Sequence, residues 1–164
     1  MYITFDDYTK LYDPIEERVF NNLAFDACRV MDMHTTGIDN VKKLRYYFPT
    51  AEEDAEAVNR CAAKMVNTLY QIQQAEIAAI ESRGYESTEQ GMRGKVISSV
   101  SAGNESISYA TGNSSATAID AAVKDKNARD KLLADIVWEY LSGVTDANGV
   151  NLLYMGRYPR RYLC

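Results

Sequence analysis

The side chains best suited to chemistry in this sequence are three cysteines, Cys28, Cys61 and Cys164, and a single histidine, His34. A structural zinc site needs three or four ligands close together, and a catalytic thiol needs an imidazole aligned with it. Cys28 lies six residues before His34, a step that does not place both on one helix face. Cys61 could reach His34 only from another helix, which is the weaker alternative. The pattern therefore predicts packed, reduced cysteines, with no metal and no cofactor.

Carboxylates gather at two places, Asp6-Asp7 and Glu52-Glu53-Asp54, and both are expected helix starts. Carboxylates in the first turn stabilise a helix through its dipole, and no pair is singled out for hydrolysis. No glycine-rich phosphate-binding motif occurs in the chain. We therefore expect a protein that is not an enzyme.

The chain is acidic overall, with a formal net charge of −5 and a pI of about 4.9. A free duplex-DNA binder usually has a basic footprint, which this composition lacks. Basic and aromatic residues near the C-terminus could contact nucleic acid by charge and stacking, but a partner-bound tail is the favoured interpretation. No signal-peptide pattern and no apolar run of about 20 residues is present, so we expect a soluble protein made in the cytoplasm without membrane contact.

Apolar residues recur at three- and four-residue steps over most of the chain, which predicts a mainly α-helical fold. The expected helices cover residues 5–11, 14–33, 39–47 and 51–82, and a last helix begins between 115 and 127 and ends near 142. Thr4 is a suitable N-cap for the first helix, and Asp13-Pro14 is a strong start signal for the second. Gly37 would supply the left-handed residue that often follows a helix.

Between residues 95 and 110 the sequence pattern changes to a two-residue alternation of side chains. This pattern predicts one projecting β-hairpin around Gly103-Asn104. Residues 84–95 are polar, contain glycine and have no period, so the hairpin is the only strand signal in the chain. An isolated hairpin is marginal in water and cannot bury its own apolar groups, Ile97, Ile107 and Tyr109. These three residues are therefore candidates for contacts between subunits.

The chain is expected to divide into a helical domain, residues 1–143, and an extended C-terminal tail, residues 144–164. This tail has no regular period but is rich in large side chains. We regard it as a segment that anchors to a partner, and its candidate interface residues are Leu152, Leu153, Tyr154, Met155, Arg157 and Tyr158. The alternative that the segment folds back onto its own bundle remains open.

The order of several segments along the chain resembles one protein family. These segments are Met1-Tyr-Ile-Thr-Phe-Asp-Asp-Tyr8, Asp13-Pro-Ile-Glu-Glu-Arg-Val-Phe20, Glu105-Ser-Ile-Ser-Tyr109, Ile136-Val-Trp-Glu-Tyr-Leu141 and Leu152-Leu-Tyr-Met-Gly-Arg157. They are similar, in this order, to the head-tail connector (head-completion, adaptor) proteins of long-tailed bacteriophages. Met155 stands where that family usually has an arginine.

The resemblance implies a small helical bundle with a projecting hairpin that assembles head-to-tail into a ring of about a dozen copies. Such a ring is a structural part of the virion neck. It binds the portal of the DNA-filled head on one side and the next neck or tail-completion protein on the other, and it extends the DNA channel. DNA would be cargo in the lumen. A tail-completion protein or another helical virion adaptor is the alternative.

Overall fold

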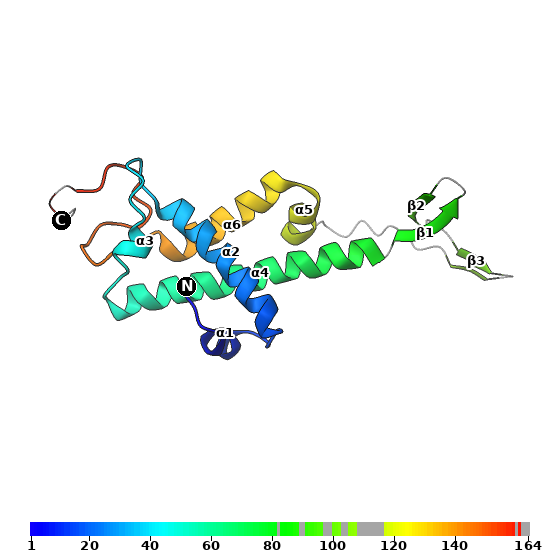
Figure 1. The fold of residues 1–164 in the computed structure, drawn as a ribbon, viewed down its shortest axis with the longest axis horizontal. Helices are drawn as coiled ribbons and strands as arrows, with labels where there is room; N and C mark the ends of the chain where they lie inside the picture. The colour runs from blue at the N-terminus through cyan, green and yellow to red at the C-terminus, as the bar shows by residue number, and fades with distance from the viewer. Residues whose placement is uncertain are drawn as a thin grey trace.

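The computed structural model describes residues 1–81, 83–88, 91–96, 100–102, 105–107, 117–159 and 161. This part of the chain is mainly helical, as predicted (Figure 1). The helices are α1 (Phe5–Leu11), α2 (Glu17–Thr35), α3 (Lys43–Tyr46), α4 (Glu52–Glu81), α5 (Ala118–Lys124) and α6 (Lys126–Leu141).

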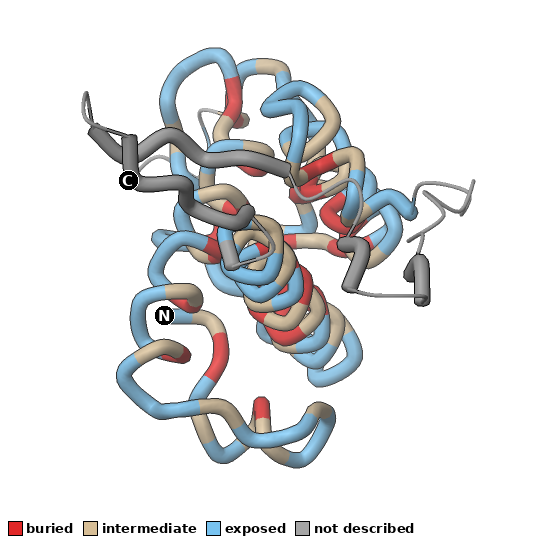
Figure 2. The backbone as a smooth tube through the Cα atoms, turned by 90° about the vertical axis from the view of Figure 1, so that its right-hand side faces the viewer, coloured by how far each residue is buried: buried red, intermediate tan, exposed pale blue. Residues whose placement is uncertain are grey.

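The core lies where α2, α4 and α6 meet, and α1 and α5 pack against this group from the outside. Figure 2 shows buried residues on the sides of the helices that face the interior and exposed residues on their outer sides. Alanines are fully buried on both of the helices α2 and α4, which contact each other: Ala24 and Ala27 on one, Ala62 and Ala63 on the other. The larger Met31, Met65 and Leu141 are fully buried in the same core.

Side-chain caps mark three helix starts. The Thr4 hydroxyl accepts a hydrogen bond from the Asp7 backbone N–H at 3.2 Å, so α1 begins and ends where the sequence predicts. Thr117 and Asp120 form a reciprocal capping box at the start of α5. Asp125 then ends α5 and caps α6, so the single last helix that we expected is in fact two.

The start of α2 differs from the prediction. Asp13 and Pro14 lie outside the helix, Glu16 has an extended conformation with ψ at 130°, and the first helical residue is Glu17. Ile15 packs against the core from this extended segment. This tertiary contact outweighs the local preference of the Asp-Pro pair for a helix start.

The connection after α2 also differs. Asn40, with φ at 60°, is the residue in the left-handed region, and Gly37 is not. Gly37 is instead required by close approach, because a Cβ there would lie 2.6 Å from the carbonyl oxygen of Gly156. The turn at Asn40 shortens the helix that follows, so α3 covers only Lys43–Tyr46 in place of residues 39–47.

Two antiparallel strand pairs follow α4. The first joins β1 (Arg83–Thr88) to β2 (Gly91–Val96), with Arg83 opposite Val96. The sequence signals strands only near residues 95–110, so this first pair is not anticipated by it. A two-stranded ladder pairs backbone groups without needing a buried face, so its sequence need not alternate.

The second pair joins β3 (Val100–Ala102) to β4 (Glu105–Ile107). The hairpin predicted over residues 95–110 falls partly outside the described residues, at 97–99, 103–104 and 108–110. Among the described elements, the only helix that contacts these strands is α4, at its junction with β1.

Candidate interaction surface at the C-terminal end

Residues 144–159 do not extend away from the bundle. Leu152 is fully buried and Val144 is 5% exposed, and both belong to the hydrophobic core. A bridge between Thr145 and Asn151 closes the segment into a loop that turns back onto the helices. The extended tail predicted for residues 144–164 is therefore corrected over 144–159, and the fold-back alternative describes this segment. Leu152 is not accessible to a partner in this fold.

The buried side chain of Lys43 holds this segment in place through hydrogen bonds. Its Nζ donates hydrogen bonds to the carbonyl oxygens of Asn151, at 3.2 Å, and Tyr154, at 2.5 Å. Burial of the ammonium lowers the pKa of Lys43, and the carboxylates of Asp146 and Asp39 partly oppose that shift. A buried charge needs hydrogen-bonding partners, and here the tail backbone supplies them.

Tyr158 makes a second attachment. Its ring stacks on Tyr47 with 4.8 Å between centroids, and its hydroxyl donates to Asp146 at 2.5 Å. Its backbone N–H donates to the Asp39 carboxylate at 2.6 Å. Burial and the Asp146 carboxylate raise the pKa of Tyr158 above its ordinary value. Tyr158 is only 4% exposed, so it holds the tail onto the helical bundle and is not a free contact residue.

Asp54, in the first turn of α4, makes a third attachment. Its carboxylate accepts hydrogen bonds from the backbone N–H of Thr145, at 3.1 Å, and from the Thr145 hydroxyl, at 2.9 Å. One acid of the Glu52-Glu53-Asp54 cluster therefore binds the tail, a role beyond the dipole stabilisation that the sequence suggested. The tail thus depends on α3, α4 and the loop before α3.

Several predicted interface residues nevertheless face outward. Tyr154 is 51% exposed and Met155 is 55% exposed, and Arg157 is also exposed. The Met155 carbonyl accepts a hydrogen bond at 3.0 Å from the backbone N–H of Ile38, whose side chain is 75% exposed. We name Ile38, Tyr154, Met155 and Arg157 the tail surface. Leu153, which is partly buried, packs against the core beneath it.

The other predicted site residues divide differently. Ile97 and Tyr109 lie outside the described residues. Ile107 ends β4, opposite Val100, and its backbone alone is described. Cys61 is fully buried in the core, where burial raises its pKa to about 12. Cys28 is half-buried, accepts a hydrogen bond from the Tyr2 N–H, and also has a raised pKa because of burial.

Within the described part of the chain, no three histidine, cysteine or acidic side chains are grouped so that they could hold a metal ion. The helices described here are all too short or too polar to cross a bilayer. Comparison of the chain with protein-family models, with curated proteins and with solved structures found no match.

Sequence reasoning missed the residues that hold the tail in place. Lys43 reads as an ordinary basic residue of a polar helix, and nothing in its spacing signals burial. Gly37 was assigned a conformational role, and its contact with Gly156 involves residues far apart in the sequence. Phe25 is a separate case. A helical projection of the sequence places it off the apolar stripe of α2, which already indicates an exposed side chain.

Proposed function

We propose that this chain is a structural subunit of the neck of a long-tailed bacteriophage, in which copies form a ring that joins the portal to the tail and extends the DNA channel. The proposal rests on the order of segments along the sequence and on the arrangement of the bundle. In this proposal the protein is part of the virion and catalyses no reaction.

The observation that carries the proposal is the placement of two distinct features at opposite ends of one helical body. The tail surface lies near the start of α4, where Asp54 binds Thr145, and the paired strands follow the other end of α4 (Figure 1). A helix of 30 residues is about 45 Å long, so the two features are separated by roughly that distance. A connector needs such separate contact regions to meet neighbours on different sides.

The strands suit a role between subunits. Apart from the α4–β1 junction, no described helix packs on them, so their edges and faces are not covered by the described bundle. Exposed strand edges pair readily with a neighbouring chain. We propose that the hairpin projects from the bundle, and that Ile97, Ile107 and Tyr109 contribute to contacts between subunits.

The tail surface suits a different partner. It combines three large exposed side chains with Arg157 and is held rigidly by Lys43, Asp54 and Tyr158. A preformed surface loses less conformational entropy on binding than a free tail would. We propose that this surface binds the portal protein, with the next neck or tail-completion protein on the other side of the ring.

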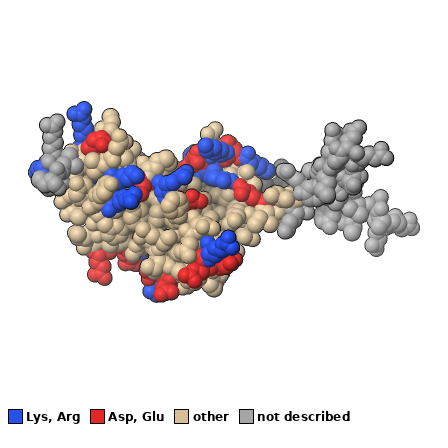
Figure 3. All heavy atoms as spheres, viewed as in Figure 1, with Lys and Arg blue, Asp and Glu red and all other residues tan. Residues whose placement is uncertain are grey.

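The net charge suits a channel that DNA passes through. An acidic lumen repels phosphates and would not retain the DNA. Figure 3 shows basic side chains interspersed with acidic ones across the middle of one face of the bundle, and further acidic side chains along its lower edge. In the proposed ring, DNA is cargo and not a bound ligand.

Electron micrographs of the purified protein, together with its mass in solution, test the proposal. Rings of about a dozen copies with a central hole are expected. A variant with Tyr154→Ser and Met155→Ser should still form rings but no longer bind the portal protein of the same phage. Its matched control, Met33→Ser, changes an exposed methionine of α2 outside the tail surface and should bind normally. A protein that stays monomeric, alone and with portal, would refute the proposal.

A further inference from the structure

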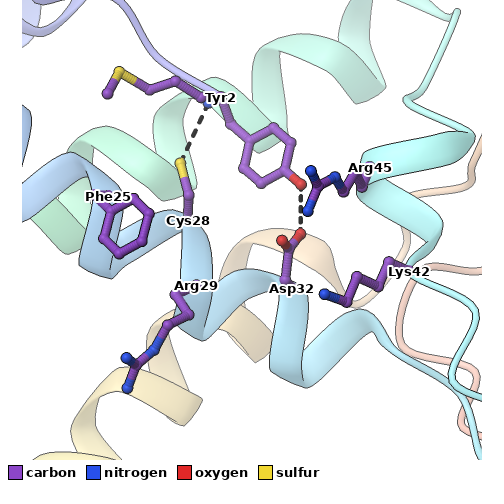
Figure 4. A pocket seen from close by; sticks show the side chains of 8 residues that line it. Tyr2, Phe25, Cys28, Arg29, Asp32, Lys42 and Arg45 are labelled. Atoms are coloured by element: carbon purple, nitrogen blue, oxygen red, sulfur yellow. Dashed lines mark hydrogen bonds between the residues drawn. The ribbon is translucent and has the colours of Figure 1, made fainter.

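A pocket of about 490 Å³ opens between the N-terminus, α2 and α3. Figure 4 shows Phe25, Cys28, Arg29 and Asp32 along α2, with Lys42 and Arg45 beside Asp32 on the opposite side and Arg29 extending away from them at the edge of the pocket. Its volume lies within the roughly 300–1,000 Å³ of pockets that enclose bound groups. The pocket is far from the strands in sequence and shares no residue with the tail surface.

One part of this pocket is apolar and uncovered. Phe25 is 65% exposed and Met1 is 69% exposed. Phe25 lies on the side of α2 away from the buried stripe of Ala24, Ala27 and Met31, so it contributes nothing to the core. Large apolar side chains that line a hollow and remain exposed are typical of a surface that another molecule covers.

The rest of the pocket is basic. Arg29, Lys42 and Arg45 line it, and none of them forms an ion pair with any other described residue. The one acid that lines the pocket, Asp32, accepts a hydrogen bond from the Tyr2 hydroxyl and offsets one of these three positive charges. In a chain of net charge −5, this is a concentration of positive charge beside apolar walls. It fits a group that is both apolar and acidic, whereas a nucleic-acid backbone would make little use of Phe25 and Met1.

The chain itself carries such a group on α6. Trp138, its one tryptophan, is 60% exposed. Asp135 lies one turn earlier on the same side of the helix and Glu139 follows directly, and both are exposed. Tryptophan is the residue type most enriched at the energetic centres of protein interfaces, so an uncovered tryptophan flanked by acids is a suitable partner for this pocket.

We propose that Trp138 of one copy inserts into the pocket of the next copy, with Asp135 and Glu139 facing the cations around it. The charges and the apolar groups of the two surfaces complement each other. Because the surfaces differ, the contact is head-to-tail and can close into a ring. This inference rests on the proposed function, since it names one contact of the proposed ring, and it assigns that contact to the bundle in addition to the strands.

The first test removes each half of the contact separately. Trp138→Ala removes the inserted side chain, and the double variant Arg29→Glu with Arg45→Glu reverses the pocket charge. Each change should raise the dissociation constant between copies by about 30-fold or more, as loss of a central interface residue does. Met33→Ala and Arg18→Glu are the matched controls, because both residues are exposed on α2 and outside the pocket. Sedimentation gives the masses, and Trp138 emission should shift to the blue when wild-type copies associate.

The second test mixes the two defective proteins. Trp138→Ala keeps an intact pocket, and the charge-reversed variant keeps an intact tryptophan. Together they should form one-to-one pairs through this contact but no closed rings, because each pair leaves one damaged half at either end. Rings that persist in either variant alone, or a mixture without pairs, would overturn this contact and leave the proposed function standing. A wild-type protein that never associates would overturn both. Binding of short duplex DNA that the charge reversal abolishes would assign the pocket to phosphate and overturn the inference.

Discussion

The two ends of the molecule are built on opposite principles. At the end near α3, residues 144–159 are held by the buried side chain of Leu152 and by hydrogen bonds to Lys43, Asp54 and Asp39. At the other end, the strands meet the bundle only where α4 runs into β1, within the described residues. One end is therefore part of the folded core, and the other is attached by its backbone connection.

The comparison indicates which part of the chain stabilises the fold and which part lies outside the core. A segment that shares the core cannot leave it without exposing apolar surface and buried polar groups, so its exposed residues form a rigid surface. A segment that lies outside the core can be changed at little cost to the fold. Substitutions at the two ends should therefore change the free energy of unfolding by different amounts.

The largest effect is expected from Leu152→Ala, because it leaves a cavity in the core. Such substitutions cost about 2–5 kcal/mol, which for a chain of this length lowers Tm by about 4–20 °C. Thermal unfolding followed by circular dichroism measures it. Leu153→Ala is the control, since Leu153 is only partly buried and its loss should cost less. Equal, small effects at both positions would mean that the tail is not part of the core.

Alkaline pH should weaken the bundle by an amount on the order of a few kcal/mol. The pKa of Cys61 is raised from 9.0 to about 12 by burial. Between these values the unfolded chain loses the thiol proton while the folded chain keeps it, so the free energy of unfolding falls as pH rises. The raised pKa of Tyr158 acts in the same direction at the tail end.

Denaturant unfolding at a series of pH values from 8 to 12 measures this loss. Cys61→Ala should flatten the decline, because it removes one of the titrating groups, even though its stability at neutral pH is lower. A Cys61→Ala variant with the same slope as the wild type would show that the thiol is not responsible.

A smaller loss is expected from Gly37→Ala, which tests the contact between the loop after α2 and the tail. Its Cβ would lie 2.6 Å from the Gly156 carbonyl oxygen, so the two segments must move apart. Overpacking of this kind costs about 1–3 kcal/mol. Gly143→Ala is the matched control, because no atom lies within 4 Å of the added Cβ, and its effect on unfolding should be close to zero. Equal costs at both glycines would contradict the close contact.

The smallest effect on stability is expected at the strand end. Replacing residues 83–116 by a flexible Gly/Ser linker should change the free energy of unfolding by about 0.5 kcal/mol or less, since no described helix other than α4 contacts the strands. Under the proposed function the same variant should no longer form rings, which light scattering and micrographs would show. A large drop in Tm would show that the strand end also contributes to the stability of the fold.

The sequence alone predicts the mainly helical character and the limits of α1 and α4. α1 runs over the predicted residues 5–11, and α4 begins within one residue of its predicted start. Apolar periodicity and caps such as Thr4 act over a few neighbouring residues, so they can be recognised locally. The large side chains of residues 152–158 also marked this segment as one that must be buried or bound, without indicating which.

Whether those side chains are buried or bound follows only from the tertiary contacts of this segment. Lys43 binds carbonyl groups of residues 151 and 154, Asp54 binds Thr145, and Gly37 adjoins Gly156, and each pair joins segments about a hundred residues apart. The same holds for the pocket, where Lys42 and Arg45 meet Phe25 and Met1. Such contacts depend on how whole helices pack, and no local spacing encodes them, because any exposed lysine or glycine would look the same in the sequence.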